Sequence, residues 1–157
     1  MHSPPSESAG IIAPPPILYL GALMIGFIMH TISPQPIFGS PAIGKWLGLL
    51  LLLLSGCLAR WAFVAMRQAG TSADPRKPST ALAINGPFRL SRNPIYLAMT
   101  GLYLGIAFFG NTGWPGILLV PLLLIMHFGV ILREERYLAK QFGAAYLEYK
   151  STVRRWL

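Results

Sequence analysis

Four stretches of apolar residues dominate the pattern of this chain. They cover residues 17–32, 45–66, 95–109 and 114–132, and each is nearly free of charged residues. Because an α-helix needs about 20 apolar residues to cross the hydrocarbon core of a bilayer, we predict four membrane-spanning helices. The third stretch has only about 15 residues, so its helix should be tilted, extended by its polar ends, or paired with the fourth as a hairpin.

A different pattern follows the fourth stretch. From Glu135 onward, apolar and aromatic residues recur three or four positions apart, as on one face of an amphipathic helix. These residues are Leu138, Phe142, Tyr146, Tyr149 and Val153. Gly143 is expected to break this segment into two shorter helices. The fold class that follows is an all-α integral membrane bundle of about four transmembrane helices, with an amphipathic C-terminal helix at the cytoplasmic interface or folded back over the bundle.

Proline and glycine mark the connections between these segments. Residues 1–16 are rich in Ser and Pro, and we predict a flexible N-terminal tail ahead of a single domain at 17–157. Residues 33–44 form a proline-broken loop, and 110–116 form a tight turn. The loop at 67–94 is the first part of the chain with enough polar groups for chemistry.

Composition and charge favour a membrane protein and exclude other classes. The 157 residues are 54% hydrophobic and 11% charged, which is too apolar for an ordinary soluble domain. The net charge of +8 does not indicate nucleic acid binding, because nearly all of it lies beside the predicted membrane helices. Lys and Arg concentrate in 67–92 and 133–155, so the positive-inside rule places these segments and both termini in the cytoplasm. The only cysteine, Cys57, is predicted to be buried in helix packing.

The richest polar stretch is GPFRLSRNPIYL, at residues 86–97. Asn is a preferred N-cap and Pro favours the first helical position, so Asn93 and Pro94 predict a helix start. Arg89 and Arg92 stand beside this start, where free backbone N–H groups and the helix dipole favour an anion. The alternative is that these arginines anchor the helix end to lipid headgroups, which leaves Tyr96 unexplained.

A second polar cluster, Arg133-Glu134-Glu135-Arg136, lies at the exit of the fourth stretch. Carboxylates at a membrane boundary are costly unless they are paired. One interpretation is a helix-end cluster in which the neighbouring arginines pair with them, and the other is that a carboxylate binds the amines or hydroxyls of a polar ligand. Because this cluster and the start at Asn93 lie on the same side of the membrane, we predict one pocket, formed mainly by residues 86–157.

Other candidate residues have a structural explanation and need no functional one. His30 and His127 are single histidines on apolar helices without a second metal-type ligand nearby in the sequence, so we predict no metal site. The spacings of Gly44 with Gly48 and of Gly101 with Gly105 are typical of close helix packing. The sequence contains no P-loop, dinucleotide fingerprint or nucleophile elbow, and it indicates no oligomeric state.

The order and spacing of these elements resemble the isoprenylcysteine carboxyl methyltransferase and phospholipid methyltransferase superfamily of membrane enzymes. The family pattern is Arg-His-Pro-x-Tyr, a hydrophobic stretch, Glu-Glu, and a Phe-Gly-x-x-Tyr-x-x-Tyr run. The corresponding residues here are Arg92-Asn93-Pro94-Ile95-Tyr96, Glu134-Glu135, and the run from Phe142 to Tyr149. The resemblance extends over about residues 45–157. Asn93 replaces the His of the best-known members and cannot titrate, so an acid/base role at this position is not expected.

The resemblance implies S-adenosylmethionine as the methyl donor, bound in a cytoplasm-facing pocket, and a bacterial inner membrane as the location. It implies Asn93, Pro94, Tyr96, Glu134 and Glu135 as residues around this cofactor. We predict a catalytic set of Arg89, Arg92 and Glu135, in which the arginines steer an anionic acceptor group. The implied acceptor is lipid-like or apolar and is an isoprenylcysteine carboxylate, a phospholipid amine or a thiol.

Two other function classes are alternatives to a membrane methyltransferase. A protein of the same fold without methyl transfer, either a nicotinamide-dependent reductase or a non-catalytic relative, shares the scaffold. A small transporter would carry charges along a path through its helices, whereas the charges here gather at one face. Binding of S-adenosylmethionine distinguishes the first alternative from the methyltransferase.

Overall fold

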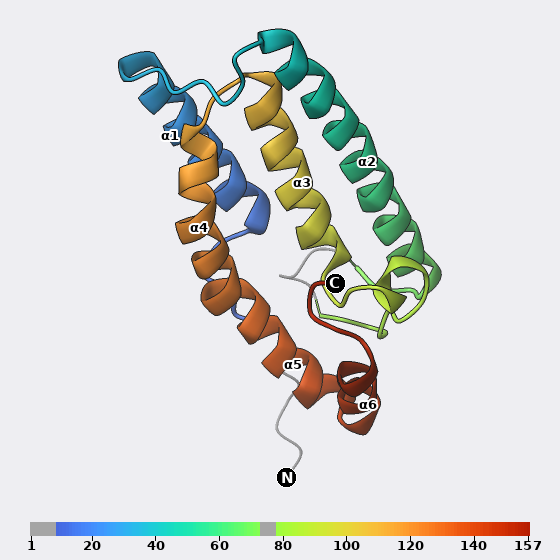
Figure 1. Cartoon of the computed structure of the whole chain (residues 1–157). Coiled ribbons are helices and arrows are strands. Elements are labelled where there is room, and N and C mark those ends of the chain that lie inside the picture. Colours follow the sequence, from blue (N-terminus) through green and yellow to red (C-terminus); the bar gives the residue numbers. More distant parts are fainter. Residues whose placement is uncertain (1–8, 73–77) are drawn as a thin grey trace.

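The computed structural model describes residues 9–72 and 78–157, and the chain is helical without strands over these ranges (Figure 1). The four main helices run alternately up and down the molecule. They are α1 (Pro15–Ile32), α2 (Pro41–Gln68), α3 (Pro94–Phe109) and α4 (Trp114–Met126). Each has a proline in its first turn, where the missing N–H costs no intrahelical hydrogen bond. The all-α bundle predicted from the sequence is confirmed.

The helix lengths agree with a membrane-spanning bundle. Three helices of the described chain are long and apolar enough to cross a bilayer, namely α1, α2 and the continuous helix from Trp114 to Phe142. With 16 residues, α3 rises only about 24 Å, which is less than the hydrocarbon thickness of about 30 Å. The expected shortness of the third helix is therefore confirmed. In the bundle α3 lies alongside α2, and α1 lies alongside α4 (Figure 1).

Glycines set the close approach of α2 and α3. A Cβ atom added to Gly48 would lie 2.5 Å from the backbone nitrogen of Phe109 and 2.7 Å from the carbonyl oxygen of Gly105. At Gly44, an added Cβ would lie 2.6 Å from the carbonyl oxygen of Phe108. The packing role predicted for these spaced glycines is confirmed, because the backbones leave no room for a side chain.

Gly48→Ala should therefore destabilise the protein by roughly 1–2 kcal/mol, because the clashing atoms are backbone and cannot rotate away. Gly56→Ala is the matched control, since an added Cβ on this glycine of the same helix meets nothing within 4 Å. Thermal unfolding of the two variants in detergent measures the difference. Equal unfolding temperatures would contradict the packing role of Gly48.

The fourth helix extends further than the sequence indicated. After α4, a π-helical turn, η2 (His127–Ile131), leads without a break into α5 (Leu132–Phe142). The amphipathic segment is thus not a separate helix from Glu135, as we expected, but the continuation of the fourth helix. The whole helix rises about 44 Å, so its charged last turns extend past the hydrocarbon core. π-helical turns occur frequently at functional sites.

The chain reverses at Gly143, as predicted. This glycine has a φ of +54°, and α6 (Ala144–Thr152) folds back toward α2 and the short 3₁₀ helix η1 (Gly86–Arg89). Tyr146 and Tyr149 of α6 are buried in a cluster with Ala62 of α2 and Phe88 of η1. Of the two placements predicted for the C-terminal segment, folding back over the bundle is the one that the structure shows.

The outer surface of the helices is apolar. Large side chains of α1, α2 and α4, among them Trp46, Leu53 and Val120, are more than half exposed, which suits contact with lipid tails. Cys57 is also exposed on α2, so its predicted burial is wrong. A thiol behaves as a small apolar group, so a lipid-facing position is as suitable for it as a protein core.

Candidate functional site

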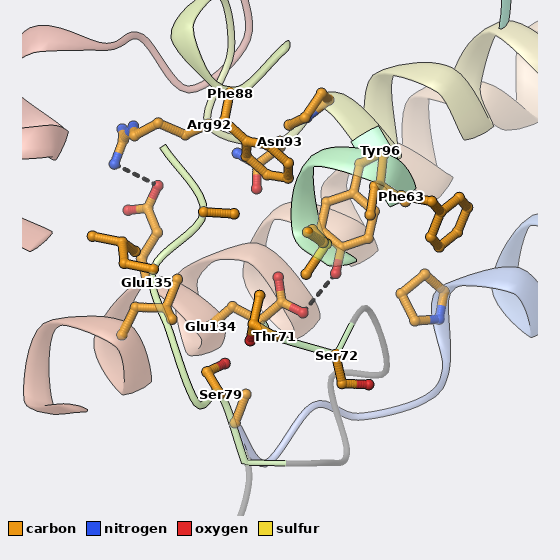
Figure 2. A pocket seen from close by; sticks show the side chains of 18 of the residues that line it. Phe63, Thr71, Ser72, Ser79, Phe88, Arg92, Asn93, Tyr96, Glu134 and Glu135 are labelled. Carbon is orange, nitrogen blue, oxygen red and sulfur yellow. Dashed lines mark hydrogen bonds and ion pairs between the residues drawn. The ribbon is translucent and has the colours of Figure 1, made fainter. Parts of the chain in front are cut away.

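A cavity of about 470 Å³ lies at the end of the bundle where α3 begins and α5 leads into α6. Its volume falls within the usual range for small-molecule sites. One part of its wall is polar and includes Thr71, Arg92, Glu134 and Glu135 (Figure 2). Another part is apolar and is formed by side chains of α2 and α3. These are Ala59, Phe63, Met66, Met99 and Leu102.

A hydrogen bond between Tyr96 and Glu134 joins the two elements singled out in the sequence. The Tyr96 hydroxyl in the first turn of α3 donates to Glu134 Oε1 in the first turn of α5 at 2.6 Å (Figure 2). A distance this short indicates a strong hydrogen bond between the two side chains. The bond fixes the direction of the carboxylate at the cavity wall, and it confirms that the two elements share one pocket.

Glu135 points to a different side of the helix and is surrounded by basic groups. Arg155 donates to both of its carboxylate oxygens, from Nε at 2.8 Å and from Nη2 at 2.9 Å. Arg92 Nη1 lies 3.2 Å from Oε1, and Lys150 Nζ lies 3.4 Å from Oε2. The side chains of Arg92 and Glu135 are only 9% and 8% exposed, so this is a buried ion-pair network.

The predicted pairing of the glutamates with neighbouring arginines is not found. Arg133 donates instead to the carbonyl oxygen of Gly10, and Arg136 donates to the carbonyl oxygen of Leu132. The charge partners of Glu135 come from α6, from the C-terminal residues and from the segment before α3. The helix-end interpretation of the cluster is therefore wrong for Glu134 and Glu135.

The C-terminal residues lie against the segment that precedes α3. The backbone N–H of Arg92 donates to the carbonyl oxygen of Arg154, and Ser91 Oγ donates to that of Arg155. The Asn93 side chain also donates to the carbonyl oxygen of Arg155, at 3.1 Å. Asn93 occupies the N-cap position of α3 as predicted, but its side chain makes no cap hydrogen bond. Its amide group holds the C-terminal segment in place instead.

Two tyrosines of α6 border the ion-pair network. Arg92 Nη1 lies 3.5 Å from the Tyr146 hydroxyl, and the Tyr149 hydroxyl donates to the carbonyl oxygen of Phe88 at 2.7 Å. Burial, followed by the charge of Glu135, raises the pKa of Tyr146. Burial also raises the pKa of Tyr149. Both hydroxyls therefore keep their protons at neutral pH and act as hydrogen-bonding groups.

Some buried polar atoms at the cavity have no hydrogen-bond partner in the part of the chain that the structure describes. Over the described residues, three buried side-chain polar atoms lack a hydrogen bond, namely Thr71 Oγ1, Arg92 Nε and Thr112 Oγ1. Thr71 and Arg92 line the cavity, whereas Thr112 belongs to the turn between α3 and α4. Leaving a buried polar group unpaired is costly, so such atoms in a cavity suit a polar ligand or an ordered water.

The structure brings together most, but not all, of the predicted site residues. Arg92, Asn93, Pro94, Tyr96, Glu134 and Glu135 all line the cavity. Arg89 does not line it, because its exposed side chain borders a separate shallow groove beside Glu148 and Tyr149.

The site also includes residues that were not predicted from the sequence, namely Thr71, Tyr146, Lys150 and Arg155. The amphipathic spacing identified Tyr146 only as an apolar position. No local pattern marked Arg155 or Lys150, because their contact with Glu135 depends on the reversal at Gly143.

Comparison with known proteins identifies proteins that are similar to this chain. Residues 43–145 match the family model described as phospholipid methyltransferase, and this range contains both the Asn93–Tyr96 and the Glu134–Glu135 elements. A protein from Haemophilus influenzae, described as uncharacterized, is 41% identical over 63 residues, which make up 40% of this chain and 89% of that protein. No solved structure matches the chain.

Proposed function

This chain belongs to the phospholipid methyltransferase family of membrane proteins, and we propose that it transfers a methyl group from S-adenosylmethionine to a lipid-like or apolar acceptor. The single observation that carries this proposal is the bond between Tyr96 and Glu134 at the wall of a cavity of about 470 Å³. It joins the two sequence elements of the family at one ligand-sized site.

The groups of the cavity fit the chemical groups of this donor. Arg92 Nε is a buried donor that has no hydrogen-bond partner among the described residues, which suits a carboxylate. Glu134 suits an amino group or ribose hydroxyls, because one carboxylate oxygen is already oriented by Tyr96. The aromatic faces of Phe63 and Phe88 line the same cavity and suit a sulfonium charge. We therefore assign the donor to the polar part of the cavity.

The protein contributes mainly alignment and the exclusion of water. When bound, the donor supplies a methyl group on a positively charged sulfur for in-line displacement. Tyr96 holds the Glu134 carboxylate in one orientation, and Glu135 holds Arg92 and Arg155 without touching the reacting atoms in our proposal. Glu135 thus becomes a positioning residue, in place of the catalytic role expected from the sequence. A carboxylate or thiolate acceptor needs no strong base, and Asn93 does not provide one.

The apolar part of the cavity suits the body of the acceptor. Phe63 is 45% exposed on α2 and lines the cavity, so the site extends from the protein interior toward the lipid-facing surface. We propose that an isoprenylcysteine carboxylate, a phospholipid amine or a thiol enters from the bilayer with its apolar part between the helices. The donor enters from the cytoplasm, because the cavity lies at the end of the bundle that carries the basic loop and tail.

Calorimetry on the detergent-purified protein tests the proposal directly. We expect saturable binding of S-adenosylmethionine and none of a reduced nicotinamide dinucleotide. Arg89→Ala should bind the donor with unchanged affinity, because its side chain lies outside the cavity. If the folded protein binds the nicotinamide cofactor and not S-adenosylmethionine, the reductase interpretation replaces ours.

A further inference from the structure

The segment before α1 packs against the molecule although the sequence predicted a flexible tail there. We call residues 9–16, which include the first two residues of α1, the strap. Ala9 and the three prolines Pro14, Pro15 and Pro16 line the cavity. In Figure 2 the blue ribbon of the N-terminal segment passes along the site. The family match begins at residue 43, so the strap and α1 lie outside the residues that match the family model.

Two hydrogen bonds hold the strap to the continuous fourth helix. The backbone N–H of Ile12 donates to the carbonyl oxygen of Gly129 at 3.2 Å, within the π-helical turn. One turn further along, Arg133 Nη1 donates to the carbonyl oxygen of Gly10 at 2.8 Å. A carbonyl oxygen has two lone pairs, so Gly129 can accept a bond from outside its own helix. The attachment thus lies directly before Glu134 in the chain.

Gly129 provides the space that this attachment needs. A Cβ atom added there would overlap the Ile12 side chain and would lie 2.7 Å from its Cγ1 atom. Ile11, on the other side of the strap, packs against the buried cluster formed by α1, α3 and α4. The strap therefore has one partly buried residue, Ile11, packed against the core. The next residue, Ile12, is half exposed, and its side chain lies over Gly129, where the missing Cβ leaves room for it.

We propose that the strap sets the size limit for molecules that enter the cavity, with Ile12 and Gly129 as the pair that keeps it closed. Its prolines are stiff and have no N–H group, so they form a wall that donates no hydrogen bond to a ligand and does not bend easily around it. If the proposed function holds, the molecule whose size is limited is the methyl acceptor, and the strap is a specificity element of this site.

Accessibility of an engineered thiol tests the strap without using the reaction. In a Cys57→Ser background, Met99→Cys places the only thiol on the cavity wall, and Gln141→Cys places it on the exposed surface of α5. Each protein is labelled with small methyl methanethiosulfonate and with a bulky dye maleimide. We expect the bulky reagent to be strongly disfavoured at position 99 and not at position 141. Gly129→Ala should raise bulky labelling at position 99 by about tenfold.

Two controls separate strap release from a change in the helix itself. Gly116→Ala lies on the same continuous helix with open space around its Cβ, and it should leave labelling unchanged. In an Ile12→Ala background, Gly129→Ala should add less than about twofold, because the overlapping atoms are already gone. Unchanged bulky labelling in Gly129→Ala would overturn the proposal, and so would a full tenfold effect in the Ile12→Ala background.

The outcome does not depend on the identity of the donor. The labelling requires no cofactor and no acceptor, so it reports on the strap even if S-adenosylmethionine fails to bind. Calorimetry with S-adenosylmethionine on Gly129→Ala gives the complementary result. We expect donor affinity to change by less than about twofold, because Gly129 does not line the cavity and the polar part of the site is unaltered.

Discussion

Replacing Glu135 with glutamine should lower the free energy of unfolding by about 3–5 kcal/mol, the usual cost of breaking a buried ion pair by removing one partner. Glutamine keeps the shape of the side chain but leaves Arg92, which is only 9% exposed, without its counter-charge. Arg155 also loses its bidentate ion pair with the carboxylate. Its side chain is 27% exposed, so water compensates part of that loss. Thermal or denaturant unfolding of the detergent-purified protein measures the change.

Two further variants isolate the role of the buried charge. Glu148→Gln removes a carboxylate from an exposed position of α6 and should change stability by less than about 0.5 kcal/mol. Arg92→Met combined with Glu135→Gln should be less destabilised than the sum of the single changes, because no unpaired charge then remains at position 92. If Glu135→Gln unfolds like Glu148→Gln, the network contributes little to the fold.

The helices and the shared pocket followed from the sequence because local signals determine them. Runs of apolar residues gave the lengths of α1 and α2, and Asn93-Pro94 gave the start of α3. The two elements that contain Tyr96 and Glu134 were predicted to lie on the same side of the membrane, and the structure shows these two residues in contact. Helix direction alternates in a bundle with short connections, so residues distant in the sequence meet at one end.

The partners of Glu135 could not be predicted in the same way. They depend on the angle at which α6 leaves Gly143 and on the return of the C-terminal residues to Ser91 and Asn93. The π-helical turn at His127–Ile131 also has no distinct sequence signal, although it shifts the register of every residue after it. The glutamates were therefore predictable from the sequence, whereas the binding of basic residues to Glu135 was not.

The contacts of the N-terminal segment could not be predicted from the sequence either. Its Ser and Pro composition suggested a tail without contacts, and residues 1–8 lie outside the described part of the chain. Residues 9–16 are held by a few individual contacts, above all the contact of Ile12 with Gly129. A glycine on a membrane helix usually indicates close helix packing, so its use as a notch for an extended segment could not be read from spacing.

Glu134→Gln should weaken binding of S-adenosylmethionine by roughly tenfold to a hundredfold, the range for loss of a hydrogen bond to a charged group. The substitution keeps the side-chain shape but removes the negative charge that we assign to the donor's amino or hydroxyl groups. Tyr96→Phe removes the hydroxyl that donates to Glu134 Oε1 at 2.6 Å, so the carboxylate is no longer held toward the cavity. Calorimetry on both variants and on the double variant measures the effects.

The two residues should act as one unit. If Tyr96 acts only by orienting Glu134, then Tyr96→Phe adds little to Glu134→Gln, and the double variant binds about as weakly as the single glutamine variant. Tyr19→Phe is the matched control, because it removes a hydroxyl bonded to Thr100 at 2.8 Å on the neighbouring part of α3 without touching the cavity. It should bind the donor normally. A Glu134→Gln protein that unfolds at the normal temperature and binds S-adenosylmethionine with full affinity would mean that the pair serves the fold and not the donor, because a carboxylate in contact with the donor's polar groups cannot lose its charge without loss of affinity.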